Sequence, residues 1–144
     1  TTKSIPVGLY WTSSAPVEKG AYVLFCPPQL GVFDDAKERG YIGAGFCQGG
    51  YGYMMKRVLA AKDDAVAVAD DGVRVNGELL PLSAPIKADK AGRPLPRYQS
   101  SSYTLGNSEV LLMSDVSATS FDGRYFGPIN RSQIKTVIRP VITW

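Results

Sequence analysis

The segment 65–80 limits the possible fold more than any other part of the chain. Its three short apolar runs, 65–68, 73–75 and 78–80, are separated by Asp-Gly and Asn-Gly pairs. Such pairs adopt the backbone angles that tight turns between antiparallel strands require. The segment therefore predicts two successive hairpins. The neighbouring acidic pairs also suggest calcium, but the ligand spacing of a calcium loop is absent and turn chemistry explains them better.

Composition extends this prediction to the rest of the chain. The 144 residues are 44% hydrophobic, which suffices for the core of one domain spanning 1–144. The 15 glycines and 10 prolines separate many short Val, Ile, Leu and Tyr runs, so a mostly β fold is favoured over a helical one. We expect further strands at 21–25, 109–113 and 134–144. The polar segment at about 83–102 is expected to be a long loop.

The segment between the first of these strands and Lys56 predicts a short helix and a loop. Asp34 or Asp35 is suited to cap the helix N-terminus, and Gly40 follows its last residue, Arg39. Six glycines then lie between 40 and 52. A phosphate-binding loop is not favoured, because no Gly-Lys-Ser/Thr ending follows. These glycines instead predict close approach of the backbone to a substrate or to another strand.

Lys56 is unusual because it lies in an apolar run that spans residues 53–61. Removing an ammonium from water is costly and lowers its pKa, and a neutral amine can accept a proton from a nucleophile. The alternative is a lysine on the polar face of a strand, with its stem over apolar neighbours. The chain contains no histidine, which excludes Ser-His and Cys-His pairs. A hydrolase built on this sequence must use lysine, a carboxylate or a metal.

Two polar segments are candidates to accompany Lys56. Ser4 precedes Pro6 and Gly8, a turn that can hold a serine rigidly with its hydroxyl exposed, although most turn serines only bond locally. The segment 114–128 brings Ser, Asp and Arg together after a predicted strand. Alternatively, these Ser, Asp and Arg residues have a structural role only, as an Asx-turn and a surface Asp–Arg pair that holds the loop.

Other classes of function receive little support. The net charge is only +3 and the basic residues do not cluster with interleaved aromatics, so we expect no nucleic-acid partner. No apolar run approaches the roughly 20 residues of a membrane span. A metal site is not expected without histidine or a Cys-x-x-Cys pair, and no cofactor is indicated. Cys26 and Cys47 admit one pairing, and two reduced thiols are as compatible with their spacing as a disulfide.

Three segments in order resemble the serine-lysine peptidases of the type I signal peptidase superfamily. They are Ser-Ile-Pro-Val-Gly at 4–8, Tyr-Met-Met-Lys-Arg-Val at 53–58 and Ser-Phe-Asp-Gly-Arg-Tyr-Phe-Gly at 120–127. Within the superfamily, the segments 4–10, 40–43, 72–77, 92–96 and 121–128 are similar to the peptidases of conjugative plasmid transfer. The resemblance covers nearly the whole chain. It implies a signal-peptidase-like fold of antiparallel sheets with one or two short helices.

The resemblance also implies roles for residues at matching positions. Ser4 is expected to be the nucleophile and Lys56 the general base. Asp122 is expected to be needed with them for activity. The supporting positions are Thr2 in the oxyanion hole, Ser120 as the residue that orients the lysine amine, and Arg124 as the partner of Asp122. The sequence departs from ordinary signal peptidases at Ile5, where methionine is usual, and at Ser114-Asp115, where Gly-Asp is common.

The location and substrate follow from the same resemblance. A membrane helix precedes the nucleophile in the family, so a chain that starts at Thr1 is expected to be the catalytic domain without its anchor. It is expected at the periplasmic face of the inner membrane, with an apolar edge toward the lipid. That compartment favours a Cys26–Cys47 disulfide. The implied substrate is an extended propilin peptide, which is cleaved through an acyl-enzyme and joined head to tail.

Three alternatives remain at this stage. A general signal-peptidase-type hydrolase would use the same residues, which do not by themselves distinguish hydrolysis from aminolysis. A self-cleaving repressor of the LexA type would need an Ala-Gly bond before the nucleophile and a helix-turn-helix. Here Ala44-Gly45 and Ala91-Gly92 both follow Ser4, and no helix-turn-helix pattern is present. A non-enzymatic β-barrel binding module would be inert toward a serine-reactive acylating probe.

Overall fold

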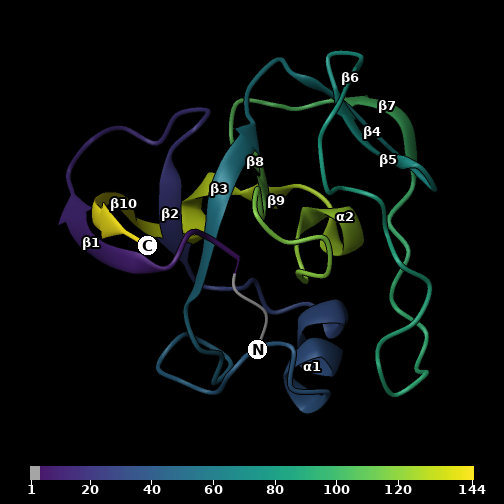
Figure 1. Ribbon diagram of the computed structural model, residues 1–144, viewed down its shortest axis with the longest axis horizontal. Coiled ribbons are helices and arrows are strands. Elements are labelled where there is room, and N and C mark those ends of the chain that lie inside the picture. Colours follow the sequence, from purple (N-terminus) through teal and green to yellow (C-terminus); the bar gives the residue numbers. More distant parts are fainter. Residues whose placement is uncertain (1–3) are drawn as a thin grey trace.

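Residues 4–144 are described by the computed structural model, and they form two antiparallel sheets with short helices (Figure 1). The larger sheet has the strand order β1 (Gly8–Ser13), β10 (Ile134–Thr143), β2 (Tyr22–Phe25), β3 (Met54–Ala60), β8 (Glu109–Met113) and β9 (Ile129–Asn130). The smaller sheet has the order β6 (Glu78–Leu79), β5 (Gly72–Val75), β4 (Ala65–Ala69) and β7 (Ser100–Thr104). The mostly β fold predicted from the sequence is confirmed.

The smaller sheet contains the two hairpins that the turn residues predicted. Strands β4 and β5 pair with Val66 opposite Val75, and β5 pairs with β6. Asn76 and Gly77 have φ angles of 52° and 86°. Both lie in the left-handed region that this turn between β5 and β6 requires, which asparagine and glycine tolerate better than other residues.

Strand β8 contributes side chains to two separate apolar clusters, one on each of its faces. Its alternate side chains point to opposite faces, as in any strand. Val110 and Leu112 belong to an apolar cluster that also contains Phe25 and Phe33, whereas Leu111 and Met113 pack in a second cluster with residues of β4 and β5. All four β8 side chains have 0% exposure. The loop that follows β8 therefore starts from a fixed position.

The helices differ in part from expectation. Helix α1 spans Gly31–Glu38, and its N-cap residue, Leu30, makes no side-chain capping hydrogen bond. The predicted N-cap at Asp34 or Asp35 is therefore wrong. Asp34 lies in the first turn, where its carboxylate accepts a hydrogen bond from the Tyr51 hydroxyl. Gly40 follows the helix with a φ of +80°, as the sequence suggested. A four-residue helix, α2 (Gly123–Phe126), and a 3-10 turn, η1 (Arg131–Gln133), complete the set.

Two strands lie where the sequence predicted turns or loop. Strand β1 follows the Ser4 turn and pairs with β10, the last strand of the chain. Strand β7 lies at the end of the predicted 83–102 loop and pairs with β4. Its sequence, SSSYT, lacks an apolar face, so the pairing with β4 decides its structure. Residues 83–99 contain one isolated bridge, Ala88–Pro94, and no helix or strand.

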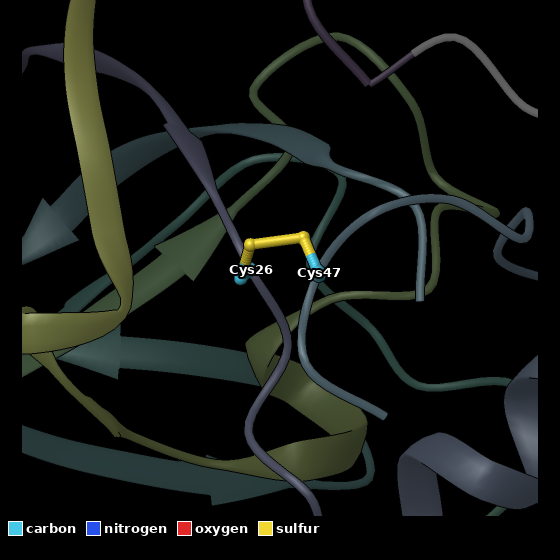
Figure 2. The surroundings of a disulfide bond; sticks show 2 residues. All are labelled: Cys26 and Cys47. Atoms are coloured by element: carbon cyan, nitrogen blue, oxygen red, sulfur yellow. A yellow bond between two sulfur atoms is a disulfide. The ribbon is translucent and has the colours of Figure 1, made fainter. Parts of the chain in front are cut away.

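A disulfide joins Cys26 to Cys47, as the resemblance implied (Figure 2). It connects the end of β2 to the glycine-rich loop across a sequence separation of 21. On the chain-entropy model such a link stabilises the fold by about 3 kcal/mol. Inside the loop, a Cβ on Gly45 would lie 2.8 Å from the Cα of Gly52, next to the bridge between Ala44 and Tyr51. The close backbone approach thus occurs within the loop itself, and approach to a substrate stays a prediction.

Candidate active site

Ser4, Lys56 and Ser120 come together from three separate segments. Ser4 precedes β1, Lys56 lies within β3, and Ser120 belongs to the loop between β8 and α2. The Lys56 Nζ lies 2.5 Å from the Ser4 Oγ and 2.6 Å from the Ser120 Oγ. The two hydroxyl oxygens are themselves 2.6 Å apart. One amine and two hydroxyls therefore form a closed triangle of hydrogen bonds.

The strand alternation of β3 places Lys56 on its buried face. Met54, Val58 and Ala60 point the same way and have at most 8% exposure. Lys56 itself is 3% exposed and lies opposite the fully buried Val23 of β2. The alternative of a lysine on the polar face of a strand is therefore wrong. Among the described residues, its amine bonds only to the hydroxyls of Ser4 and Ser120.

Burial changes the chemistry of this amine. Loss of hydration disfavours the charged form and lowers the pKa of Lys56 to about 8. The Asp122 carboxylate opposes this shift in pKa, and the Arg124 guanidinium reinforces it. A large fraction of the lysine is then neutral at mildly alkaline pH. In that state its nitrogen can accept the proton of a neighbouring hydroxyl.

Asp122 and Arg124 form a buried ion pair beside the triangle. Both side chains have 0% exposure, and the guanidinium donates from Nε and Nη2 to the two carboxylate oxygens at 2.8 and 2.9 Å. Such two-point geometry is the strongest form of this interaction. The alternative of a surface pair is therefore wrong. Sequence separation alone cannot distinguish a surface pair from a buried pair.

The pair fixes the loop that carries Ser120. The Asp122 carboxylate also accepts hydrogen bonds from the backbone N–H groups of Ser114 and Arg124. The guanidinium donates to the carbonyls of Ser117 and Ala118. Both ends of the 114–124 loop are thereby held. Asp122 acts on Lys56 through its field and through this loop, since no hydrogen bond joins it to the amine among the described residues.

A cavity of about 380 Å³ opens beside Ser4 and Lys56. Its walls include the apolar or aromatic residues Tyr41, Ile86, Leu95, Phe121 and Tyr125. Its size and mostly apolar lining fit the side chain of a bound ligand, with the triangle at one wall. Segment 83–99 contributes much of the lining. The sequence predicts a long loop here, and residues 92–96 belong to the resemblance, but no site residue was predicted in this segment.

Polar contacts hold the cavity wall against the region after α1. The Tyr41 hydroxyl donates to Asp89, which also pairs with Arg93 at 2.7 Å. Arg39 donates to the Pro94 carbonyl. A signal for this arrangement existed in the sequence. An Asp and an Arg four residues apart around Gly92, between apolar Ile86 and Leu95, indicate a structured turn with a buried side.

The remaining expectations concern Thr2, metals and membrane spans. Thr2 lies outside the described residues, so its proposed place in an oxyanion hole stays a prediction. Within residues 4–144, no group of three or more Cys, Asp or Glu side chains is placed to hold a metal ion. In the same part of the chain, no helix combines the length and apolar character needed to cross a bilayer.

In the described residues, a serine hydroxyl lies within hydrogen-bonding distance of a buried lysine amine, at the wall of a largely apolar cavity. The chain belongs to the signal peptidase family, peptidase S26, whose family model matches residues 3–144. The sequence is 99% identical to a plasmid transfer protein TraF from Escherichia coli, over all of this chain and 81% of that protein. It is 34% identical to a conjugal transfer protein TraF from Agrobacterium tumefaciens, over 99% of this chain and 80% of that protein.

A solved structure gives a further comparison. The signal peptidase I of Enterococcus faecalis V583 aligns over 87% of this chain and 98% of its own chain, with a TM-score of 0.48 and 18% sequence identity.

The lowered pKa of Lys56 predicts the pH dependence of the site. The base must be neutral to accept a proton, so kcat/KM should rise with pH through about 8 and level off above it. A pH series of peptide cleavage rates checks this. A rate that is already at its plateau at pH 6 would show that Lys56 is not the titrating base.

The buried pair predicts a large effect on stability. Asp122→Ala leaves the Arg124 guanidinium buried without its counter-charge, which should lower the free energy of unfolding by about 3–5 kcal/mol. Urea unfolding measures this. Asp71→Ala is the matched control, because Asp71 pairs with Arg74 three residues away in an exposed position and should change stability little. Equal effects of the two substitutions would contradict the prediction.

Proposed function

We propose that this chain is a serine-lysine peptidase that processes the pilin precursor of a conjugative transfer system. The observation that carries the proposal is the 2.5 Å contact between the Ser4 hydroxyl and the buried Lys56 amine. The relatives named for plasmid or conjugal transfer support the biological setting. The substrate chain would bind in extended form, with a side chain in the cavity lined by Tyr41, Leu95 and Tyr125.

The proposed reaction begins with proton transfer from Ser4 to Lys56. The Ser4 Oγ attacks the scissile carbonyl as neutral Lys56 takes the hydroxyl proton, and the resulting ammonium then gives a proton to the leaving amine. The Ser4 N–H and the Thr2 hydroxyl would stabilise the oxyanion. Ser120 holds the amine in line, and the Asp122 carboxylate favours the ammonium that forms.

The acyl-enzyme has two possible fates. Attack by water releases a cleaved peptide with a free carboxylate. Attack by the N-terminal amine of the same pilin forms a new peptide bond and gives a cyclic product. We propose the cyclic product, because the resemblance to peptidases of conjugative transfer extends over most of the chain. A general signal-peptidase-type hydrolase remains the competing function, since both outcomes need the same dyad.

The binding-module alternative is less compatible with the site. A binding module gains nothing from a desolvated lysine amine that, within residues 4–144, bonds to two hydroxyls and to no charged group, an arrangement that costs stability. A catalytic role explains why the protein keeps this unfavourable arrangement, because shifted pKa values are concentrated at functional sites. We therefore favour an enzyme over a β-barrel module that recognises a ligand without reacting with it.

The proposed location is the periplasmic face of the inner membrane. Next to the Ser4 turn, strand β1 exposes Leu9 at 58% and Trp11 at 67%, strand β10 exposes Ile142 at 57%, and Trp144, directly after β10, is 72% exposed. Leu9 lies directly opposite Ile142 in the pairing of the two strands. Exposed aromatics of this kind favour the interface between lipid and water. This apolar edge would keep the nucleophile close to a membrane-bound substrate.

The dyad assignment predicts the effect of three substitutions on processing. Ser4→Ala, Lys56→Ala and Lys56→Arg should each abolish processing of the propilin while the domain remains folded. The arginine variant fails because its guanidinium stays protonated. Ser102→Ala and Lys62→Ala, at exposed positions outside the site, serve as controls and should process normally.

Mass spectrometry of propilin incubated with membrane-anchored enzyme provides the readout. A product lighter by one water than the processed linear chain reports cyclisation. A linear product alone would favour the hydrolase. Substantial processing by any of the three folded site variants would reject the Ser4–Lys56 assignment.

The exposed edge predicts binding to lipid vesicles. Trp11→Ser with Trp144→Ser should weaken binding to vesicles that contain anionic lipids by about tenfold or more, since burial of one large apolar side chain contributes roughly 1.5–3 kcal/mol. Tyr53→Ser is a suitable control, because Tyr53 is 54% exposed just before β3 rather than on this edge. Vesicle flotation measures the change. Equal binding of the double variant and the parent would exclude the edge as a membrane contact.

A further inference from the structure

The Tyr10 side chain contacts the turn that carries Ser4 at Pro6, which lies four residues earlier in the sequence than Tyr10. Its hydroxyl donates a hydrogen bond of 2.6 Å to the carbonyl of Pro6, two residues after Ser4. Beside it, the N–H of Trp144 donates to the Val7 carbonyl at 2.8 Å. Pro6 has no N–H of its own and a restricted φ, so its carbonyl is a rigid point of attachment. The Tyr10 hydroxyl therefore fixes the segment from which the Ser4 hydroxyl projects.

The pairing of β1 with β10 is irregular at Tyr10. Leu9 pairs with Ile142, whereas Tyr10 pairs with Pro140, so the register shifts between Leu9 and Tyr10. Val141 of β10 has no partner on β1, so β10 carries the extra residue of this bulge. Proline at the opposing position also removes one donor from the ladder. The pairing of β1 with β10 is therefore irregular next to Tyr10, the residue that contacts the nucleophile turn.

Tyr10 is supported by three further side chains, Tyr22, Arg57 and Asp115, which we call the Tyr10 cluster. The Tyr10 and Tyr22 rings meet edge to face with their centroids 6.2 Å apart. The Tyr22 hydroxyl and the Arg57 guanidinium donate to the same Asp115 oxygen at 2.8 and 2.9 Å. Arg57 also lies over the Tyr22 ring, 5.0 Å from its centroid. The position of the Tyr10 ring is therefore set by a bonded network.

Both tyrosines remain donors over the working range of pH. Burial, aided by the nearby Asp115 carboxylate, raises the pKa of Tyr10. Burial and the hydrogen bond to Asp115 raise the pKa of Tyr22 to about 12. Each hydroxyl thus keeps its proton, and the Tyr10 bond to Pro6 persists wherever Lys56 can act as a base.

The Tyr10 cluster touches each segment that supplies the site. Tyr10 holds the Ser4 turn, and Arg57 is the neighbour of Lys56 on the opposite face of β3. Asp115 follows Ser114, whose N–H donates to Asp122 at the base of the Ser120 loop. The cluster thus lies next to the segments of the nucleophile, the base and the orienting hydroxyl, through a ring contact at Tyr10 and through chain neighbours at Lys56 and Ser114.

We infer that Tyr10 is a positioning residue for the Ser4 nucleophile, acting through the Pro6 carbonyl and held in place by the Tyr10 cluster. This inference rests on the proposed peptidase function. Loss of the hydroxyl allows the Ser4 turn to shift relative to Lys56. A shift of the nucleophile lowers the rate of attack without removing any contact to the substrate.

The test compares Tyr10→Phe with Tyr103→Phe in propilin processing by the membrane-anchored enzyme. Each substitution removes one hydroxyl that donates at 2.6 Å, but Tyr103 bonds to Glu109 on an exposed surface away from the site. Tyr10→Phe should lower kcat by about tenfold or more, in line with the cost of small misplacements at a reacting centre, and leave KM within about twofold. Tyr103→Phe should change neither constant.

A second variant keeps the inference open to test if Tyr10→Phe is unstable. Tyr22→Phe keeps the ring contact with Tyr10 and removes only the bond to Asp115, so kcat should fall by less than in Tyr10→Phe, again at constant KM. A parental kcat in both folded variants, with Ser4→Ala inactive, overturns the positioning role and leaves the peptidase function standing. Full processing by Ser4→Ala overturns the peptidase function and the positioning role together.

Discussion

The desolvation of one lysine amine is the constraint on which this structure depends. An ammonium buried at 3% exposure is costly, and the protein meets that cost by lowering its pKa and giving the nitrogen two hydroxyl partners. In a chain without histidine, burial of a lysine is one way to provide a group that is largely neutral, and so able to accept a proton, above a pH of about 8. Strand β3 supplies the apolar surroundings, and the Ser4 turn and the Ser120 loop supply the partners.

The two members of the Asp122–Arg124 pair have opposite effects on the pKa of Lys56. A buried carboxylate alone would raise the pKa of Lys56 and reduce the fraction of neutral amine, but the adjacent guanidinium acts on the pKa in the opposite direction. The pair as a whole is nearly neutral, so its main effect is geometric. It holds both ends of the loop that presents Ser120 while disturbing the protonation of the amine only modestly.

Local signals in the sequence predicted much of the fold. Asp-Gly and Asn-Gly pairs predicted the hairpins at 65–80. The apolar neighbours of Lys56 predicted a lysine with a lowered pKa. Other features depend on contacts that no local pattern contains. Strand β7 is polar and is ordered by its pairing with β4, and the burial of Asp122 and Arg124 depends on distant segments. The bond from Tyr10 to the Pro6 carbonyl is likewise a contact that no local pattern predicts. The resemblance named Ser4, Ser120 and Asp122; the structure brings the two serines to Lys56 and places Asp122 in the ion pair that holds the Ser120 loop.

The pairing of β1 with β10 has a consequence for the timing of assembly. The strand that follows Ser4 is hydrogen-bonded to the last strand, and the N–H of Trp144 bonds back to Val7. Contacts between such distant parts of a chain form late, because the loop they close is long. During synthesis on the ribosome, Ser4 therefore lacks its final support until the C-terminal strand has emerged. Completion of the turn that carries Ser4 therefore depends on the pairing of β1 with β10, two segments that lie far apart in the sequence.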